Sequence, residues 1–426
     1  MQVQVKKSFY QSFGGINFMN ADLVSIDFST LATQTLGSRS LSTRYSYADL
    51  LKHLFFSKAI GGNVLDDINT LKGQLKDHPQ LKIASPDTIE YAFKELVQPT
   101  KKIITASGKE HFINEHKGFN TLFSKLCMHT GLLNSKDQYT LDYDGHIVEN
   151  TKIDNASTYK KSEGYYPVMC SINKLPIYVQ NRNGNTPESY KQQSLIRATL
   201  QQCAAEKIII GKFRADACCY EKSTIELLEN KNITYYIRAE QNENLRIAFE
   251  DERDWQPAML NNCKVEICSM EEPILGNDKL RRIVAYRRKL SNEQATIFDN
   301  NGYRYQAIVT SDKESESLDV IMIYNKRGSD GEHHFKELDY DFSWNKLPFD
   351  SFEMNTIYMY ATAIAYILFQ FMKKKYSAAL SFINPTMRLK NFILHFVTLV
   401  AKWIHTGRQW ILKIFTTKDY SPLWCT

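Results

Sequence analysis

The order of strand and helix patterns between residues 139 and 238 constrains the fold of this chain more than any other feature. In sequence, the segments are strand Tyr139–Val148, strand Tyr165–Ile172, strand Pro176–Gln180, helix Glu188–Glu206, strand Lys207–Arg214, helix Tyr220–Asn230 and strand Ile233–Arg238. The close spacing of the first three strands predicts an antiparallel meander. The continuous apolar run within Lys207–Arg214 is typical of a central strand that is covered on both faces.

A ribonuclease-H-like (retroviral-integrase-like) α/β core has this order of elements: three strands, a helix, a strand, a helix and a strand. The polar, strand-rich stretch from residue 240 to about 305 interrupts this order and predicts an inserted β subdomain. Two further strand patterns, Tyr305–Thr310 and Leu318–Tyr324, are expected to return to the core. A helix that begins near Gly328 and a long apolar helix after Pro348 complete the predicted core.

Both ends of the chain are expected to be helical. In the N-terminal part, Ser85 and Pro86 form a helix start signal, and Pro99 ends that helix. Short helices joined by short loops are compatible with a helix-turn-helix DNA reader. They are equally compatible with a helical bundle that has no nucleic-acid role. The tail after Lys373 interleaves basic and aromatic residues, and we expect it to form helices.

The charge of the chain is unevenly distributed. The formal net charge is +6, from 53 basic and 47 acidic residues. The last 55 residues contain nine Lys or Arg and one Asp, so the tail carries +8 and the rest of the chain about −2. This asymmetry predicts a polyanionic partner, either nucleic acid or an anionic membrane. A hydrophobic content of 43% with 23% charged residues is ordinary for a globular protein and excludes disordered and fibrous classes.

The eight cysteines include no C-x-x-C pair, so the strong zinc signatures are absent. The N-terminal residues lack the apolar region of a signal peptide. Scattered cysteines without a secretion signal indicate reduced thiols and a cytoplasmic protein.

One apolar segment bears on the question of a membrane. Met354–Met372 carries no charge over 19 residues, which is long enough in principle to cross a bilayer. Polar residues interrupt it, and its tyrosines lie along its length rather than at its ends. We therefore favour a buried core helix over a membrane span.

Acidic residues stand at strand ends and on a predicted helix. The strand period of two places Asp142 and Asp144 on the same face of their strand. Asp216 ends the apolar strand, and Glu332 follows the pattern Tyr324-Asn-Lys-Arg327-Gly. Each acid taken singly has the ordinary interpretation of a surface charge. Together they match what Mg²⁺ (or Mn²⁺) requires, because carboxylates that converge on one point are tolerable only when cations neutralise them.

At these residues the sequence resembles bacterial insertion-sequence DDE transposases. It is most similar to the insertion-sequence family numbered thirteen-eighty, which is akin to the insertion-sequence-four group. The resemblance runs from about Thr140 to Phe371. It rests on these segments, in order: Leu141-Asp-Tyr-Asp144-Gly, Tyr159-Lys-Lys-Ser-Glu-Gly164-Tyr-Tyr-Pro167, Arg182-Asn-Gly184-Asn185, Arg214-Ala-Asp216, Tyr324-Asn-Lys-Arg327-Gly with Glu332, and Asn345-Lys-Leu-Pro348-Phe349 with Asn355.

The resemblance implies that three acids bind divalent metal and catalyse DNA strand cleavage and transfer. They fall on Asp144 (or Asp142), Asp216 and Glu332, with spacings of 72 and 116 residues. The long second gap would hold the inserted subdomain, as in relatives that cut through a hairpin intermediate.

The sequence departs from the related signature around the third acid. That signature has Tyr, two residues, Arg, three residues, Glu, six residues and Lys. Here four residues separate Arg327 from Glu332, and Asp339 stands where Lys is expected. Lys336 shares the helix face of Glu332 and is the candidate to contact phosphate instead, beside Tyr324 and Arg327.

The predicted insertion adds further candidates for DNA binding. Trp255 is a candidate to stack on an extruded base, with a subdomain core position as its alternative. The basic cluster between residues 279 and 289 is expected to lie along DNA near the cleaved end. Its candidate members are Arg281, Arg282, Arg287, Arg288 and Lys289.

These observations divide the 426 residues into five segments. They are a helical N-terminal DNA-binding domain (1–135), the first part of the ribonuclease-H-like core (136–239), the inserted β-rich subdomain (240–305), the second part of the core (306–371) and the basic aromatic helical tail (372–426).

The function predicted from the sequence is cut-and-paste transposition. The expected enzyme binds the terminal inverted repeats of its element, cleaves there and joins the freed ends to target DNA. Its expected partners are double-stranded DNA and a second copy of the chain, in a bacterial cytoplasm at the nucleoid. A catalytically silent DNA-binding or regulatory relative is the alternative, and a membrane-anchored protein is a distant third.

Overall fold

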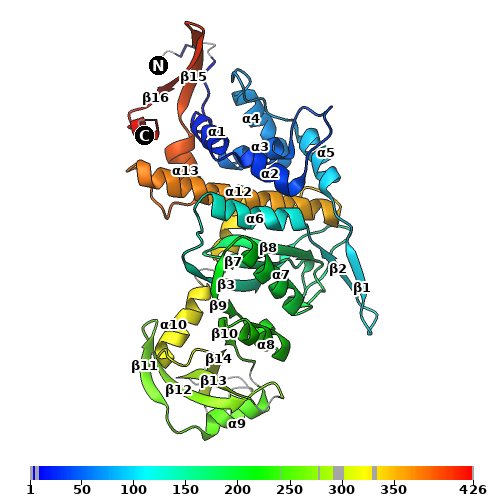
Figure 1. The fold of residues 1–426 in the computed structure, drawn as a ribbon, viewed down its shortest axis with the longest axis vertical. Helices are drawn as coiled ribbons and strands as arrows, with labels where there is room; N and C mark the ends of the chain where they lie inside the picture. The colour runs from blue at the N-terminus through cyan, green and yellow to red at the C-terminus, as the bar shows by residue number, and fades with distance from the viewer. Residues whose placement is uncertain are drawn as a thin grey trace.

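The computed structural model describes residues 3–4, 9–240, 242–276, 279–290, 302–328 and 333–424. Figure 1 shows an elongated molecule with three layers along its length. The N-terminal helices lie at one end, and a long helix crosses the molecule beneath them. The large sheet continues from that helix to the opposite end.

Eleven strands form one mixed sheet in the order β1-β2-β8-β7-β3-β9-β10-β14-β13-β12-β11. Its central strands are β8 (Leu175–Arg182), β7 (Val168–Ile172), β3 (Gln138–Gly145), β9 (Ile209–Ala215) and β10 (Thr234–Arg238). The pairs β8–β7 and β7–β3 are antiparallel, whereas β3–β9 and β9–β10 are parallel. This arrangement is consistent with the predicted ribonuclease-H-like core.

Two helices make the crossovers of this core. They are α7 (Gln192–Ala205), between β8 and β9, and α8 (Lys222–Asn230), between β9 and β10. A parallel neighbour needs such a crossover, because a tight turn can only reverse the strand direction. A small sheet of β4 (Val148–Glu149), β5 (Ala156–Ser157) and β6 (Glu163–Tyr165) interrupts the meander between β3 and β7.

The segment expected to be an inserted subdomain extends the central sheet. It contains α9 (Glu243–Asp251), β11 (Gln256–Leu260), β12 (Cys263–Pro273) and β13 (Leu280–Lys289). β14 (Tyr303–Thr310) pairs antiparallel with β10 on one side and with β13 on the other. β14 therefore covers the edge of β10, and the inserted strands continue the sheet beyond β14.

One strand prediction is wrong. Leu318–Tyr324 lies in helix α10 (Ser317–Arg327), which packs against the sheet at β9, β10, β12, β13 and β14. Val320 and Ile321 are fully buried, whereas Met322 is 42% exposed. A short apolar run fits a strand or a buried helix equally well, so only the surface it packs on decides between them.

The N-terminal part contains six helices and a hairpin among the described residues. The helices are α1 (Gly15–Ser25), α2 (Phe28–Leu36), α3 (Tyr47–Ala59), α4 (Ile68–Gln74), α5 (Pro86–Leu96) and α6 (Lys117–His129). Ser85 caps α5 as expected, and its hydroxyl accepts from the Thr88 amide. The hairpin of β1 (Lys101–Ile104) and β2 (Glu110–Asn114) joins the large sheet through β8, so this stretch is not all helical.

The charge-free segment forms the long helix α12 (Phe352–Ala379), as predicted for a core helix. Its residues are buried between the N-terminal helices and the sheet, with contacts to α3, α5, α6 and β8. In the part of the chain that the structure describes, no helix is both long and apolar enough to cross a membrane.

The tail is not helical throughout, in contrast to the prediction. After the short helix α13 (Leu389–Phe392), β15 (Val400–Thr406) and β16 (Gln409–Phe415) form a hairpin that projects at the end of the molecule (Figure 1). Gly407 and Arg408 form its turn, both with positive φ, which suits a two-residue hairpin connection.

Candidate functional site

Two of the predicted acids lie together where two parallel strands end. Asp144 is near the end of β3, and Asp216 directly follows β9. These strands are neighbours, with Tyr143 opposite Ala215. Parallel strands that end together place the following residues at the same edge of the sheet. Glu332, the third predicted acid, lies outside the described residues.

Arg327 bridges these two acids from the last turn of α10. Its Nη2 donates to Oδ1 of Asp144 at 2.8 Å and lies 3.8 Å from Oδ2 of Asp216. Asp144 and Arg327 are largely buried, whereas the Asp216 side chain is 36% exposed. The site therefore has a buried side, where Asp144 lies, and a side that is open to solvent.

The crowding of these groups is visible in their pKa values. Burial raises the pKa of Asp144 to about 6, against the opposing effect of Arg327, and the nearby Asp216 raises it further. Burial works against the charge of Arg327, but the Asp144 and Asp216 carboxylates raise its pKa above the ordinary value. Among the described residues, the Arg327 guanidinium faces two carboxylates, and one positive charge cannot neutralise both of them.

A further acid, Glu188, lies beside the pair, and the sequence analysis did not select it. It precedes α7 and is 8% exposed. Ligand atoms of Glu188, Asp216 and Cys218 lie within 4.8 Å of one another. Burial, followed by the charges of Asp216 and Asp144, raises the pKa of Glu188 to about 7.

The sequence pattern predicts Glu188 at the start of a helix, where an acid is common. The signal that could have identified it is its place in the loop that follows Gly184 and Asn185, directly after a core strand. Such loops at the edge of a sheet often supply site residues.

Asp142 occupies a different environment from Asp144. Both of its oxygens accept from Arg214, each at 2.7 Å, and both side chains are buried. Because a bidentate guanidinium pair uses both carboxylate oxygens, the structure does not favour Asp142 as a metal ligand. The strand period correctly places Asp142 on the same face of β3 as Asp144, but Arg214, the residue that pairs with Asp142, comes from the neighbouring strand β9.

A cavity of about 510 Å³ opens beside Asp216 and Glu188. The loop between β5 and β6, the segment after β8 and the turn after β9 supply most of its lining. The lining includes Lys109, Thr158, Tyr159, Tyr166, Asn185, Ser189 and Cys218. Tyr159 is 69% exposed. The acids are therefore accessible from a hollow with polar and aromatic walls.

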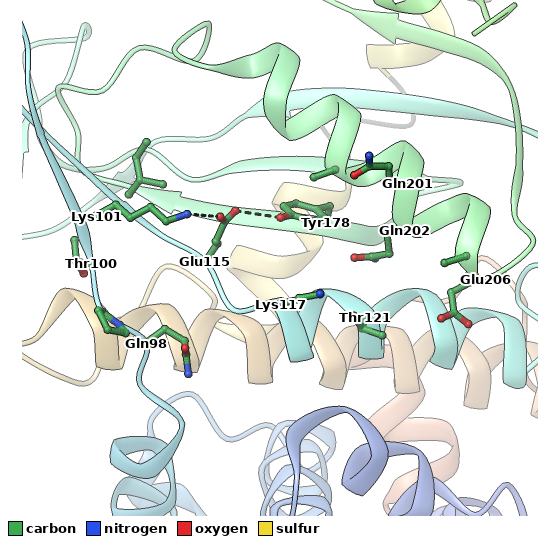
Figure 2. Close-up of a pocket in the computed structure, with 14 residues that line it drawn as sticks. Gln98, Thr100, Lys101, Glu115, Lys117, Thr121, Tyr178, Gln201, Gln202 and Glu206 are labelled. Atoms are coloured by element: carbon green, nitrogen blue, oxygen red, sulfur yellow. Dashed lines mark hydrogen bonds and ion pairs between the residues drawn. The ribbon is translucent and has the colours of Figure 1, made fainter.

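A larger cavity, of about 760 Å³, lies between the segment after α5, helix α6 and helix α7. Figure 2 shows Lys101 and Tyr178 pointing toward Glu115 within it. Lys101 donates to Glu115 at 2.9 Å and Tyr178 at 3.1 Å. None of Asp144, Asp216 or Glu188 lines this cavity, so its size alone does not make it part of the acidic site.

The comparisons with known proteins identify the family. The profile described as "Transposase DDE domain group 1" matches residues 10–423, nearly the whole chain. The chain belongs to this DDE transposase family. Among solved structures, the piggyBac transposase in a synaptic complex with hairpin DNA is similar, with 14% identity and a TM-score of 0.36, over 90% of this chain and 84% of that chain. No curated protein matches. The prediction of a DDE transposase is therefore confirmed, whereas these comparisons do not specify an insertion-sequence family.

DDE transposases are normally metal-dependent DNA transposases. The residues of this member fit a divalent metal in two respects. Carboxylates of Asp144, Asp216 and Glu188 cluster at one place. The Glu188 Oε1 atom is buried, and no described residue forms a hydrogen bond with it. Carboxylate oxygens are the ligands that Mg²⁺ and Mn²⁺ prefer, so a cation would satisfy both features.

The departure of this DDE transposase from the related signature has a structural explanation. Asp339, on α11 (His333–Phe342), lies 2.7 Å from Nε2 of His146. The His146 ring also stacks on Phe335, with 4.6 Å between centroids. These contacts connect α11 to the end of β3, so Asp339 pairs with a residue of the core at the position where the signature has Lys. Lys336 is exposed on the same helix, which is compatible with the predicted phosphate contact.

The basic cluster of the insertion is largely engaged within the protein. Arg281 is 4% exposed and pairs with Glu229 at 2.9 Å. Arg282 donates to the carbonyls of Asp312 and Ser315. These contacts do not fit a continuous DNA-facing patch. Arg288 and Lys289, at the end of β13, are exposed.

The aromatic candidate in the insertion is also covered. The Arg287 guanidinium lies 4.3 Å from the centroid of the Trp255 ring and 4.4 Å from that of Tyr303. Arg287 also pairs with Glu266 at 2.6 Å. The Trp255 ring packs against Tyr305 as well. This environment favours the alternative interpretation of Trp255 as a packing residue over base stacking.

Proposed function

We propose that this DDE transposase cleaves DNA at the terminal inverted repeats of its element and joins the freed 3′-OH groups to target DNA. Asp144, Asp216 and Glu332 are its catalytic acids. The observation that supports this best is the meeting of Asp144 and Asp216 at adjacent strand ends, with Arg327 between them. Helix α11 begins directly after Glu332 and is tied to β3 through His146 and Asp339.

The residues of the site have distinct roles in this proposal. The acids hold Mg²⁺ or Mn²⁺, which would supply the positive charge that phosphoryl transfer needs. Asp144 provides the buried carboxylate and Asp216 the exposed one, toward the cavity where DNA enters. Arg327 contacts the aspartates in the free protein and is placed to contact a phosphate when cations take over their charge. Water is the nucleophile of the first step and the 3′-OH that of the second.

DNA binding outside the acids is proposed for the exposed cations near the site. Lys336 on α11 and Arg288 and Lys289 at the end of β13 are exposed, and half-buried Tyr324 lies one turn before Arg327. Such contacts to phosphates position the duplex without reading its sequence. Two copies of the chain would bring the two ends of the element together.

The test is a cleavage assay with the inverted-repeat DNA that flanks the reading frame, with and without Mg²⁺. The variants Asp144→Asn, Asp216→Asn and Glu332→Gln keep the side-chain shape and remove the charge. We expect each to lose cleavage by at least a thousandfold and to keep repeat binding, with the triple variant little worse than each single one. Asp251→Asn, an exposed acid on α9, is the control.

Two outcomes would count against this proposal. Wild-type cleavage by Asp144→Asn or Asp216→Asn would exclude these acids as the catalytic set. Repeat binding by the wild-type protein without any metal-dependent cleavage would favour the catalytically silent DNA-binding relative instead.

A further inference from the structure

Glu188 is a buried acid at the site that the three-acid proposal does not use. It lies in the loop between β8 and α7, and its main-chain carbonyl accepts from Tyr143 at 2.7 Å and from Arg182 at 2.9 Å. Tyr143 and Arg182 are themselves fully buried. Two buried side chains therefore hold the Glu188 backbone in place at the edge of the sheet.

The carboxylate of Glu188 is only half satisfied. Oε2 accepts from the Tyr166 hydroxyl at 2.7 Å, but the buried Oε1 has no hydrogen-bond partner among the residues that the structure describes. In the part of the chain that the structure describes, no Lys, Arg or His forms an ion pair with it. A buried carboxylate without a cation is costly, because desolvation penalises its charge. The loop geometry thus leaves a position for a positive charge.

The surroundings of Glu188 point to where that charge would lie. A carboxylate oxygen of Asp216, the Cys218 sulfur and a carboxylate oxygen of Glu188 lie within 4.8 Å of one another. Gly145, directly after Asp144, faces the same carboxyl, because an added Cβ there would lie 2.8 Å from Cδ of Glu188. Glu188 is therefore next to both aspartates of the proposed site.

We propose that Glu188 is a fourth carboxylate of the metal site and shares a divalent cation with Asp216. This inference rests on the proposed function and adds a ligand to it. The two carboxylates suit Mg²⁺ or Mn²⁺, whereas a thiol suits softer metals, so Cys218 is a neighbour rather than a ligand. Tyr166 orients the Glu188 carboxylate through its hydrogen bond.

The test measures Mn²⁺ binding to the full-length protein without DNA, by calorimetry and electron paramagnetic resonance. Glu188→Gln keeps an oxygen that can accept from Tyr166 and removes the charge. We expect it to weaken Mn²⁺ binding at least tenfold. Tyr166→Phe removes the hydrogen bond but keeps the carboxylate, so its Mn²⁺ affinity should fall no more than threefold. Cys218→Ser and the control Asp251→Asn should bind as the wild type does.

A cleavage assay with the same proteins completes the test. Glu188→Gln should cleave at least a hundredfold more slowly than the wild type and bind repeat DNA equally well. Wild-type Mn²⁺ affinity in a folded Glu188→Gln protein would overturn the inference. A tenfold loss in Cys218→Ser would overturn the oxygen-ligand assignment.

The two proposals fail in different ways. If Asp144→Asn and Asp216→Asn lose metal binding and cleavage but Glu188→Gln does not, only the role of Glu188 is wrong. If Asp144→Asn and Asp216→Asn also keep wild-type metal binding and cleavage, the proposed function itself is wrong. The melting temperature of each variant establishes that it is folded.

Discussion

At the scale of single residues, neighbouring acids on one strand have different roles because their partners differ. Asp142 and Asp144 project from the same face of β3. Asp142 is matched by Arg214 from β9, and the pair is buried and bidentate. Asp144 meets Arg327, which also approaches Asp216, so in the described part of the chain two acids share this one guanidinium. The first pair is complete, whereas the second has an excess of negative charge.

This difference predicts opposite consequences for the two substitutions to Asn. Asp142→Asn removes the charge that matches the buried Arg214 in a bidentate pair, so it should lower the free energy of unfolding by ~3–5 kcal/mol. Urea unfolding followed by circular dichroism measures this change. Asp144→Asn should cost much less stability, because Arg327 still has Asp216 nearby, but should abolish cleavage. Equal stabilities of Asp142→Asn and the wild type would contradict the structural role of this pair.

At the scale of elements, helix α12 connects the N-terminal helices to the sheet, and a buried lysine is part of that contact. Lys58, on α3, is 1% exposed. Its Nζ donates to the Asn63 carbonyl at 2.9 Å and to the Tyr358 hydroxyl of α12 at 3.0 Å. Burial lowers the pKa of Lys58 to about 7, which shows the cost of a charge between these helices.

The depressed pKa of Lys58 predicts a pH-dependent stability. The unfolded chain binds this proton up to pH ~10.4, whereas the folded protein releases it near pH 7. The free energy of unfolding should therefore rise with pH between these values, by at most ~1.4 kcal/mol per pH unit. Below pH 7 Lys58 is protonated in both the folded and the unfolded state, so its destabilising effect no longer changes with pH. Lys58→Met should lack this rise. If the free energies of unfolding of the wild type and of Lys58→Met changed equally with pH between pH 7 and 10, this prediction would be wrong.

The tail hairpin is the second element with a testable role. Phe392 and Phe396 are fully buried and pack on Tyr376, so deleting residues 373–426 would open the core rather than test DNA binding. The exposed cations of the hairpin, Arg408 and Lys413, offer a cleaner test.

Neutralising the hairpin should change the salt dependence of DNA binding. We expect Arg408→Gln with Lys413→Gln to reduce the slope of log K against log salt by ~2, since each phosphate contact contributes ~0.9. The control is Lys222→Gln with Lys231→Gln, at the start of α8 and directly after its end, at a distance from the hairpin in Figure 1. An unchanged slope in the hairpin variant, measured by fluorescence anisotropy, would assign the hairpin to packing alone.

At the scale of the whole molecule, the segments predicted as separate domains share their cores. One buried apolar cluster extends from Ile16 in α1 through the sheet and α12 to Tyr420 in the tail. A smaller cluster lies between α10 and the strands of the insertion, and includes Val265 and Val284. The N-terminal helices and the tail therefore depend on the central region for burial.

This continuity predicts cooperative unfolding. A fragment of residues 136–371 would expose the face of α12 that packs on α3 and α5, so we expect it to be insoluble or to lack a cooperative melt. The full chain should unfold in a single transition by calorimetry. A separate, reversible melt of the fragment at the temperature of a transition in the full chain would show independent domains.

The sequence by itself determined the features that depend on local pattern. The strand and helix order of the core, the cap of α5 at Ser85, the burial of α12 and the placing of Asp144 and Asp216 at strand ends all follow from periodicity and turn signals. The DDE transposase assignment follows from the motifs around these acids. Such features are set by residues close in sequence, whose spacing alone specifies which face is buried.

Only the tertiary structure decided which groups meet. Leu318–Tyr324 became a helix because it packs on the face of the sheet, and the tail became a hairpin that pairs with Gln11 through Ala401. The pairing of Asp142 with Arg214 and the place of Glu188 beside Asp216 depend on partners that lie 72 and 28 residues away in sequence. The charge and burial of a side chain in its folded surroundings set its role, and no sequence period encodes those surroundings.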